Sequence, residues 1–392
     1  MKTKDGGGCK KMKFDIARLY LLPSNLPSRI IEDKTDNIRN SSSVFNALYL
    51  LEEQIVPIIT SIESNGILIS STWLESEIRR LNQLLGSTHQ LHSLITILNL
   101  KKQQGDNKTD MELSHIKKWI IPLERTSNAS FSDFRIKGKW KLFSSYSGRI
   151  SASQMPLTSM PKRMRKYVIS SSSEKELWSI DLNQAELRFL GYYADDNFLL
   201  DHFSTNNDMY SYIGNLISNY SCNTWPKCLR NVSKTFLLAW LYGASTNTLM
   251  KKLRKNDFNI TSVDVNHILE QLERTIPQAV HYLDTCSTSR EVRTFFGYAI
   301  PLVEMKKSTK RNFGLQSSVA TAIKLLMLEA QNLKLDVVHV IHDEIWIEVN
   351  PTYSKWQNHL QQNFNTTMNS YHKGFPLNNI LNFKKMEEKI NG

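Results

Sequence analysis

Residues 178–188, WSIDLNQAELR, decide the fold, and residues 338–349, VHVIHDEIWIEV, supply their counterpart. The first stretch is an apolar strand that ends at Asp181, and the second places Asp343 at the bend between two apolar strands. Two such aspartates can meet on one sheet, where their charges repel unless cations lie between them. Together they predict the geometry of two-metal phosphoryl transfer, although each alone could be only a helix-start or turn residue.

A helix is predicted directly after the first aspartate. Asn183 and Glu186 have the spacing of a capping box, which satisfies the first backbone N–H groups of a helix. Leu187 and Leu190 would lie on its apolar face.

The order of predicted elements indicates one sheet domain with an insertion. Strand-like pieces at residues 139–181 and 337–349 enclose a block at 201–290 that is helical almost throughout. Ahead of them, a helix despite Pro57, a turn at Asn65 and Gly66 and a helix from Ser71 to Leu85 predict a helical hairpin.

The charge balance favours a polyanionic partner. The 392 residues include 49 Lys and Arg against 37 Asp and Glu, a net charge of +12. Basic clusters at residues 101–102, 162–166, 251–255 and 306–311 are mixed with apolar or aromatic residues, which predicts a basic surface for nucleic acid. An ordinary basic protein would also show this net charge.

The cysteines are Cys9, Cys222, Cys228 and Cys286, with neither a CxxC pair nor zinc-type spacing. A reducing compartment is expected. No run approaches the roughly 18 apolar residues of a membrane span, and the chain start lacks a signal-peptide core. We expect a soluble protein without a membrane partner, in the cytoplasm or at the nucleoid, with an organelle left open.

A helix predicted from Pro226 to Tyr242 carries a stripe of two cations, one apolar residue and one aromatic residue. Arg230, Lys234, Leu238 and Tyr242 follow one another at intervals of four and therefore share one face. Such a stripe could bind a triphosphate at one end and a base at the other. A core helix with two surface cations is the alternative.

These pieces, in this order, resemble the three polymerase motifs of family A DNA polymerases, the group of bacterial DNA polymerase I. Residues 147–153 (SGRISAS), 294–297 (TFFG) and 312–316 (NFGLQ) are similar to further segments of that family. Residues 55–67 look like the start of its thumb, and the resemblance covers roughly residues 46–388.

The resemblance implies an α+β right-hand polymerase fold with an antiparallel-sheet palm, helical fingers and a helical thumb. The expected division has a partly disordered N-terminal extension at 1–44, the thumb at 45–138 and the fingers at 201–290. The palm would combine residues 139–200 with 291–392.

The resemblance also implies a catalytic centre. Asp181 and Asp343 would bind two Mg²⁺ ions, for which Mn²⁺ can substitute, with the backbone carbonyl of Leu182 as a further ligand. Glu344, also counted with the metal site, would tune it. Lys234, the third catalytic residue, would neutralise the triphosphate and could protonate the leaving pyrophosphate.

Nucleotide binding is assigned in the same way. Arg230 would hold the outer phosphates, and Tyr242 would occupy the templating-base position until the helix closes on a nucleotide. Glu186 resembles the steric gate that fills the space of a ribose 2′-hydroxyl, although helix-cap chemistry would also favour it. Gln184 and Arg188 would support the site.

Four residues match positions that contact the minor groove near the primer terminus: Arg149, Asn312, Gln316 and His342. Their donors could meet acceptors that every correct base pair presents, so they would check the shape of a pair without reading its sequence.

The chain departs from the family pattern at three places. Leu238 stands where the family usually has Phe or Tyr, so stacking on the incoming sugar is lost. Tyr210 stands where His is common, and the loop at 156–162 is shorter and lacks the family's Asn residues.

The expected function is template-directed extension of a primer with dNTPs, with primer-template DNA as partner and a processivity or replication partner as a further one. The stretch before Val44 is too short for an exonuclease domain, so neither 3′–5′ nor 5′–3′ exonuclease activity is expected. A single-subunit RNA polymerase of the phage type and a non-catalytic DNA-binding scaffold are the alternatives. Replication, repair and lesion bypass all stay open.

Overall fold

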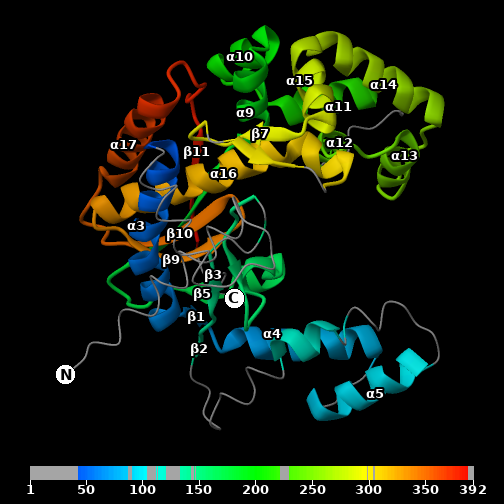
Figure 1. Cartoon of the computed structure of the whole chain (residues 1–392). Helices are drawn as coiled ribbons and strands as arrows, with labels where there is room; N and C mark the ends of the chain where they lie inside the picture. The colour runs from blue at the N-terminus through cyan, green and yellow to red at the C-terminus, as the bar shows by residue number, and fades with distance from the viewer. Residues whose placement is uncertain are drawn as a thin grey trace, which may run out of the picture.

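The computed structural model describes residues 43–86, 91–103, 112, 114–120, 133–142, 145, 147–220, 229–297, 299–302 and 305–386. Most of the predicted N-terminal extension, the predicted helix start at Pro226 and the cysteines other than Cys286 lie outside these residues. Figure 1 shows a helical block above, strands in the middle and a two-helix lobe below.

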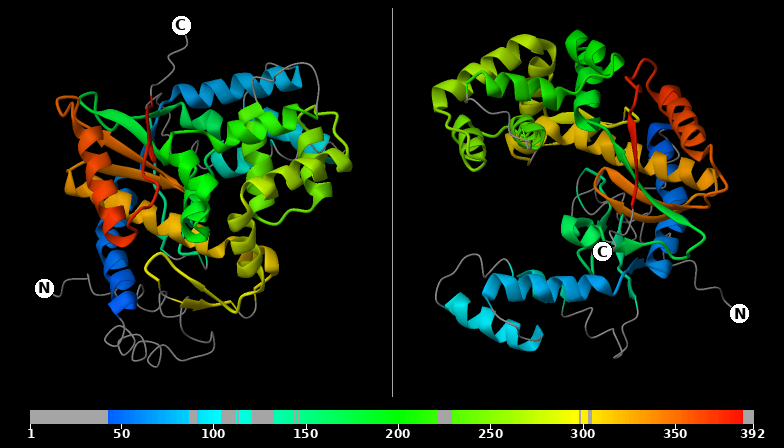
Figure 2. Two further views of the ribbon diagram at one scale, coloured as in Figure 1. Left: turned by 90° about the horizontal axis from the view of Figure 1, so that it is seen from above. Right: turned by 180° about the vertical axis from the view of Figure 1, so that it is seen from behind.

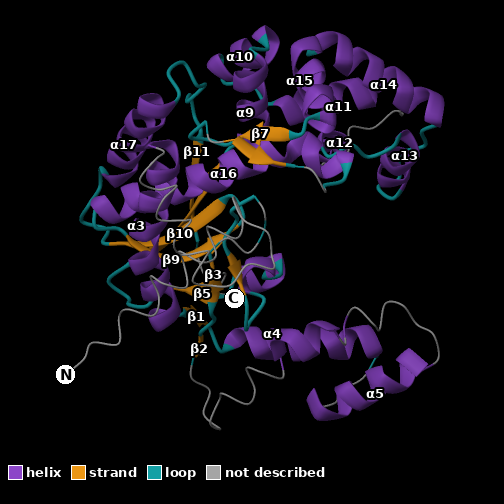
Figure 3. Cartoon of the chain, viewed as in Figure 1, coloured by secondary structure: helices purple, strands orange, loops and turns teal. Residues whose placement is uncertain are grey.

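The central sheet has four antiparallel strands in the described part of the chain, in the order β11-β6-β10-β9. The bounds are β6 Glu176–Leu182, β9 Asp336–Ile341, β10 Glu344–Val349 and β11 Leu381–Lys385. Strand β6 is therefore flanked on both sides by strands from the C-terminal part of the chain, β10 and β11, which are labelled in Figure 3. In this register Asp181 lies opposite Glu344 on one side and Asn382 on the other.

Three helices pack around this sheet, as the two views of Figure 2 show. They are α3 Ser43–Asn65, α16 Lys307–Asn332 and α17 Trp356–Tyr371. Helix α16 contacts α3, α17, β9 and β10, which explains why residues 345–349 are buried without interruption. No helix in the described part of the chain has the length and apolar character needed to cross a membrane.

The block between β6 and α16 is helical, as predicted. Its helices are α9 Ala185–Ala194, α10 Asn197–Ser204, α11 Met209–Ser218, α12 Leu229–Leu241, α13 Thr246–Arg254, α14 Ser262–Thr275 and α15 Pro277–Thr288. The hairpin of β7 Glu291–Arg293 and β8 Ala299–Pro301 follows it. The structure thus has a helical block between two strands of one sheet, β6 and β9, as predicted. The strands ahead of β6, which are β3 Trp140–Lys141, β4 Ser151–Ala152 and β5 Val168–Ile169, belong to other sheets.

The predicted helical hairpin at the start is wrong in one respect. Between α3 and helix α4, Thr72–Leu85, the chain forms strand β1, Ile67–Ile69. Gly66 makes the turn with a φ of +67°, and a Cβ there would lie 2.5 Å from the Ile136 carbonyl oxygen. The strand arises from pairing with segments far away in sequence, which local periodicity cannot predict.

The remaining elements form the lower part of the molecule. Strand β1 pairs with β2 and β5, and β3 pairs with β4. The bounds are α5 Leu91–Gln103, π-helix η1 Ile116–Ile120, β2 Phe134–Ile136, β3 Trp140–Lys141, β4 Ser151–Ala152, 3₁₀ helix η2 Leu157–Ser159, α8 Lys162–Arg165 and β5 Val168–Ile169. Helices α4 and α5 form the lobe on the opposite side from α10–α15 (Figure 1).

Candidate active site

The two aspartates singled out from the sequence lie together. Asp343 belongs to the two-residue turn between β9 and β10, and its backbone carbonyl accepts a hydrogen bond from the Leu182 amide at 3.0 Å. Both aspartates line the same cavity. Burial, and then the negative charge of Asp343, raise the pKa of Asp181 above its ordinary value. Two carboxylates that line one cavity and repel each other favour a bound cation.

The backbone beside each aspartate is left-handed. His342 has a φ of +52° and Gln184 a φ of +54°. Gln184 is buried, and its side-chain oxygen accepts a hydrogen bond from the Met209 amide at the start of α11. Such conformations cost free energy and persist where tertiary contacts hold them, typically at functional sites.

The predicted capping box is wrong. Helix α9 begins at Ala185, and the left-handed Gln184 at its N-cap makes no side-chain cap. Glu186 instead accepts hydrogen bonds from the Tyr242 hydroxyl at 2.7 and 2.8 Å and from Arg149 at 3.2 Å. Asn183 donates to the Asn379 carbonyl at 3.4 Å. Partners from distant segments have replaced the local cap.

Burial of Glu186 has an electrostatic consequence. It raises the pKa of this carboxyl group, although the hydrogen bond from Tyr242 and the positive charge of Arg149 act in the opposite direction. The Arg149–Glu186–Tyr242 contact connects the segment before β4, helix α9 and the end of α12.

The predicted stripe faces the aspartates. Arg230, Lys234, Leu238 and Tyr242 all line the cavity that contains the aspartates, whose volume is about 360 Å³. This volume is in the range of small-molecule sites. Helix α12 spans Leu229–Leu241, and Gly243 follows it with a φ of +75°, as predicted for the helix end.

Two residues that the sequence did not mark as ligands hold the cations of the stripe. The guanidinium of Arg230 donates to both carboxylate oxygens of Asp208, at 2.9 and 3.0 Å. The Tyr210 ring lies 5.2 Å from the Arg230 guanidinium carbon and 5.6 Å from the Lys234 ammonium. Asp208 caps α11, so only its helix-start pattern could have drawn attention to it.

The four minor-groove candidates divide into two pairs. Arg149 and His342 line the cavity. Asn312 and Gln316 do not, but they lie seven and three residues before Val319, which lines it from α16. Positions at these intervals share one helix face, so both lie on the side of α16 that reaches the cavity.

Glu344 lies outside the cavity lining, and its carboxylate is engaged elsewhere. One oxygen accepts hydrogen bonds from Ser179 and Trp346, both at 2.6 Å, and the other accepts from Arg165 at 3.0 Å. The side-chain amide of Asn382 instead lies 3.4 Å from the Asp181 carboxylate. The two residues are 201 positions apart in the sequence and are neighbours because β11 pairs with β6. No sequence signal marked this neighbour.

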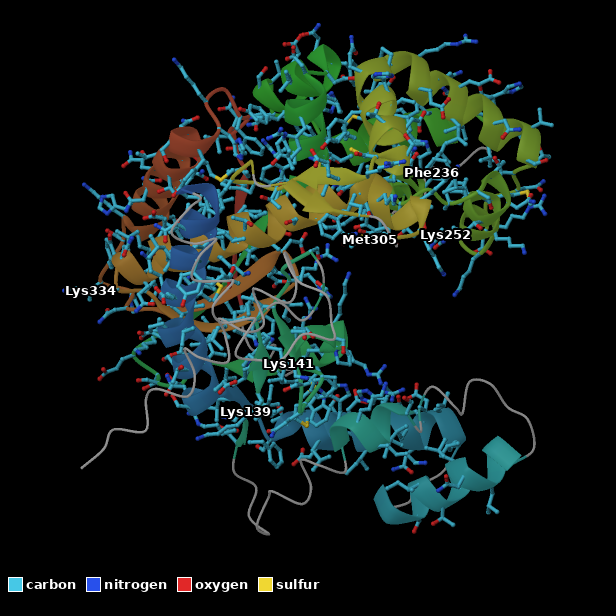
Figure 4. The ribbon with its side chains drawn as sticks, viewed as in Figure 1. Lys139, Lys141, Phe236, Lys252, Met305 and Lys334 are labelled. Atoms are coloured by element: carbon cyan, nitrogen blue, oxygen red, sulfur yellow. The ribbon has the colours of Figure 1, made fainter. Side chains whose placement is uncertain are left out.

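Two arginines of the basic cluster at 162–166 are paired with carboxylates. Arg165 binds Glu344, and Arg163 lies 3.2 Å from Glu77. The cluster at 251–255 lies at the end of α13, and Figure 4 places its Lys252 in the upper helical block, with Lys141 on β3 below. Exposed positive charge therefore occurs on both parts.

Arg188 supports the loop that follows Asp181. Its guanidinium is buried and donates to the carbonyls of Asn183 at 2.8 Å and Pro376 at 2.6 Å. Burial lowers its pKa to about 10, so it stays charged at neutral pH. This contact anchors the backbone that carries the left-handed Gln184.

The donors fit a hard divalent cation that shares its coordination with substrate. The described residues include no group of three or more His, Cys, Asp or Glu that could hold a metal alone. The cavity offers the carboxylates of Asp181 and Asp343 and the backbone of Leu182. Mg²⁺ typically uses one or two carboxylates and completes its shell with water and substrate phosphates.

Comparisons with known proteins agree with this geometry. The model of DNA polymerase family A matches residues 74–381. DNA polymerase I of Bacillus caldotenax is 23% identical over 230 residues, which are 51% of this chain and 25% of that protein. The enzyme of Pseudomonas aeruginosa is 21% identical over 418 residues, covering 88% and 45%. The chain thus spans less than half the length of these relatives.

A solved structure confirms the fold. The POL domain of Pol1 from M. smegmatis, in complex with DNA primer-template and dNTP, matches with a TM-score of 0.71 and 16% identity. The match covers 96% of this chain and 81% of that domain. The predicted α+β class with an antiparallel sheet is confirmed. Because the family model spans most of the chain, this chain belongs to DNA polymerase family A.

Proposed function

We propose that this chain is a template-directed DNA polymerase that adds dNTPs to a primer 3′-hydroxyl by two-metal phosphoryl transfer. The observation that carries the proposal is one cavity in which two aspartates face a helix bearing Arg230 and Lys234. Acidic groups for cations and basic groups for phosphates line this one cavity. Primer-template DNA and dNTPs are the proposed partners.

The proposed subdomains follow from this assignment. Residues 139–200 and 291–392, which contribute the central sheet, would be the palm. The helical block at 201–290 would be the fingers, and residues 45–138 the thumb. Helix α3 packs on α16 and β9, which makes it a support of the palm as well.

Members of this family depend on metal ions. In this chain, Asp181, Asp343 and the Leu182 carbonyl would hold two Mg²⁺ or Mn²⁺ ions, while Glu344 tunes the site through its hydrogen bonds. When bound, the ions would lower the pKa of the primer hydroxyl and stabilise charge on the triphosphate.

The basic stripe would bind the triphosphate. Lys234 is exposed and can reach phosphate oxygens, neutralise charge and donate a proton to the leaving pyrophosphate. Arg230 is bound to Asp208, so the outer phosphates would compete with this carboxylate for the guanidinium. Tyr210 would keep both cations in place through its ring.

The other end of the stripe would select the nucleotide. Tyr242 would occupy the templating position, and its bond to Glu186 would break when the helix closes. Glu186 would exclude a ribose 2′-hydroxyl, which favours DNA over RNA synthesis. Leu238 offers no aromatic ring for the sugar, and Gln184 holds the start of α11.

Primer extension by the pure protein tests the proposal. We expect extension with dNTPs and Mg²⁺ or Mn²⁺, little with NTPs, and none without metal. Asp181→Ala and Asp343→Ala should abolish extension but retain primer-template binding. Asp336→Asn, at the opposite end of β9, is the matched control and should retain extension. Extension by both alanine variants would refute the site, and extension with NTPs alone would indicate an RNA polymerase.

A further inference from the structure

A buried ion pair joins two helices outside the cavity. The ammonium nitrogen of Lys324, on α16, lies 2.5 Å from Oε1 of Glu52, on α3. The side chains are 2% and 0% exposed. The same nitrogen donates a hydrogen bond to the Gly148 carbonyl at 2.8 Å. The pair therefore connects α3, α16 and the residue directly before Arg149.

Cohesion between α3 and α16 does not by itself account for these charges. Burying two ions is costly, and an apolar pair of similar volume often holds two helices equally well. Oε2 of Glu52 has no hydrogen-bond partner in the described part of the chain, and burial raises the pKa of this carboxyl group. An apolar pair could not make the hydrogen bond to Gly148. That bond is the specific contribution of the pair.

The segment so anchored leads into the cavity. Gly148 has a φ of +76°, a left-handed conformation that favours glycine. The next residue, Arg149, lines the cavity and donates to Glu186, which also accepts from Tyr242. The contacts thus run without a break from the buried Lys324 to the cavity wall.

We propose that Lys324 and Glu52 are positioning residues for Arg149. Glu52 fixes the ammonium group of Lys324, and this group fixes the Gly148 carbonyl, so that the Arg149 guanidinium is held at one depth against the primer-terminal base pair. The inference rests on the proposed polymerase function and adds a determinant of terminal-pair checking to it.

Loss of the Lys324–Glu52 pair should change the selectivity for matched primer termini more than the rate of phosphoryl transfer. Asp181 and Asp343 are held by the pairing of β6 with β10 and by the hydrogen bond from the Leu182 amide to the Asp343 carbonyl, not by the Gly148 segment. Loss of the pair would let Arg149 shift, so its donors would meet the acceptors of a correct pair less often. Matched termini would lose more than mismatched ones.

The test uses the double variant E52M/K324M. It removes both charges together, so neither is left alone in the core, and methionine adapts to irregular space. The ratio of kcat/KM for matched over mismatched primer termini should fall about tenfold. The control is Ile62→Val, a buried substitution on α3 about 15 Å from Glu52 along the helix, which should lower stability and leave the ratio unchanged.

A double-mutant cycle with Arg149→Ala locates the effect. If Lys324 and Glu52 act through Arg149, adding E52M/K324M to the Arg149→Ala variant should not lower the ratio further. A second, additive fall in that background would overturn the proposal. So would an unchanged ratio in E52M/K324M itself.

Hydrogen exchange of the DNA-free protein separates this inference from the proposed function. Amides in residues 147–153 should exchange at least tenfold faster in E52M/K324M and at an unchanged rate in Ile62→Val. Unchanged exchange in E52M/K324M would overturn the positioning role even if the unaltered protein extends primers. Faster exchange in a protein that extends no primer would support the anchor and overturn the polymerase assignment alone.

Discussion

Two groups of carboxylates in this chain differ in whether they form ion pairs. In the lobe, Glu77 is 4% exposed and lies within 3.2 Å of Arg80, Arg163 and His115, while Glu112 binds Arg80 as well. We name these five residues the lobe network. Both of its carboxylates are paired with cations.

The proposed catalytic pair, Asp181 and Asp343, lacks such partners. Neither has a salt bridge within the described residues, and Asp181 has only the weak contact of the Asn382 amide at 3.4 Å. Arg230 and Lys234 of α12 line the same cavity, and the charge of Lys234 acts to lower the pKa of Asp181. The comparison teaches that, among the described residues, the lobe carboxylates are held in ion pairs, whereas the two aspartates are left without an ion pair where a metal and a triphosphate are expected.

The pKa shifts of the two groups have opposite signs. Burial and the charge of Asp343 raise the pKa of Asp181. Burial alone would also raise the pKa of Glu77, but the hydrogen bond from His115 and the charges of Arg80 and Arg163 outweigh it and lower this pKa. Perturbation by an uncompensated like charge is the more typical sign of a functional site.

The largest expected effect is on the catalytic side of the comparison. Lys234→Ala removes the exposed cation that would stabilise charge on the triphosphate, and kcat should fall about 10²–10³-fold. Single-turnover extension checks this. Lys175→Ala, which removes a paired surface cation, is the control and should extend normally. Equal rates for both variants would contradict the assignment of Lys234.

The lobe network should respond in stability instead. Glu77→Gln removes the charge shared by two arginines and a histidine, and the free energy of unfolding should fall by about 2 kcal/mol. Chemical denaturation measures the change. Primer extension per folded molecule should stay within twofold of the unaltered protein, and a large loss would make the lobe network part of the chemistry.

The pH dependence of stability sharpens the contrast. A carboxyl group whose pKa is raised in the folded state destabilises the ionised fold. This cost vanishes below the pKa of the same group in the unfolded state, which is near 3.8 for Asp181. Asp181→Asn should therefore raise the melting temperature by a few degrees at pH 7, and the gain should shrink toward pH 4. An Asp181→Asn variant less stable than the unaltered protein at pH 7 would contradict the repulsion.

Glu77 should behave in the reverse way. Because its pKa is lowered in the folded state, ionised Glu77 stabilises the fold above pH 4.5, the pKa of the unfolded state. This contribution is lost as the pH falls through the pKa of the folded state. The deficit of Glu77→Gln at pH 7 should therefore shrink below about pH 4.5. In thermal melts at pH 7, the melting temperatures of the two variants should differ from that of the unaltered protein in opposite directions. Both differences should shrink toward pH 4.

Local sequence patterns predicted much of the site. The His342–Asp343 turn, the spacing of the α12 stripe and the strand ending at Asp181 depend on residues within one element or its neighbour. Their juxtaposition followed from treating both aspartates as strand-end residues of one sheet. The structure places all of them on one cavity.

The errors come from contacts between distant segments. Glu186 has the spacing of a helix cap but bonds Tyr242, 56 residues away. Asn382 reaches Asp181 only because β11 pairs with β6. Strand β1 has the same cause, since its partners β2 and β5 lie far away in sequence. Periodicity and spacing contain no information on such partners.

The most direct measurement is the number of divalent cations bound at the catalytic pair. Mn²⁺ binding is followed by electron paramagnetic resonance in the complex with chain-terminated primer-template and matching dNTP. We expect two ions per complex for the unaltered protein and for Asp336→Asn, and fewer for Asp181→Asn and Asp343→Asn. Two ions in both of the latter variants would contradict the account, because the uncompensated carboxylates would then not be what holds the metal.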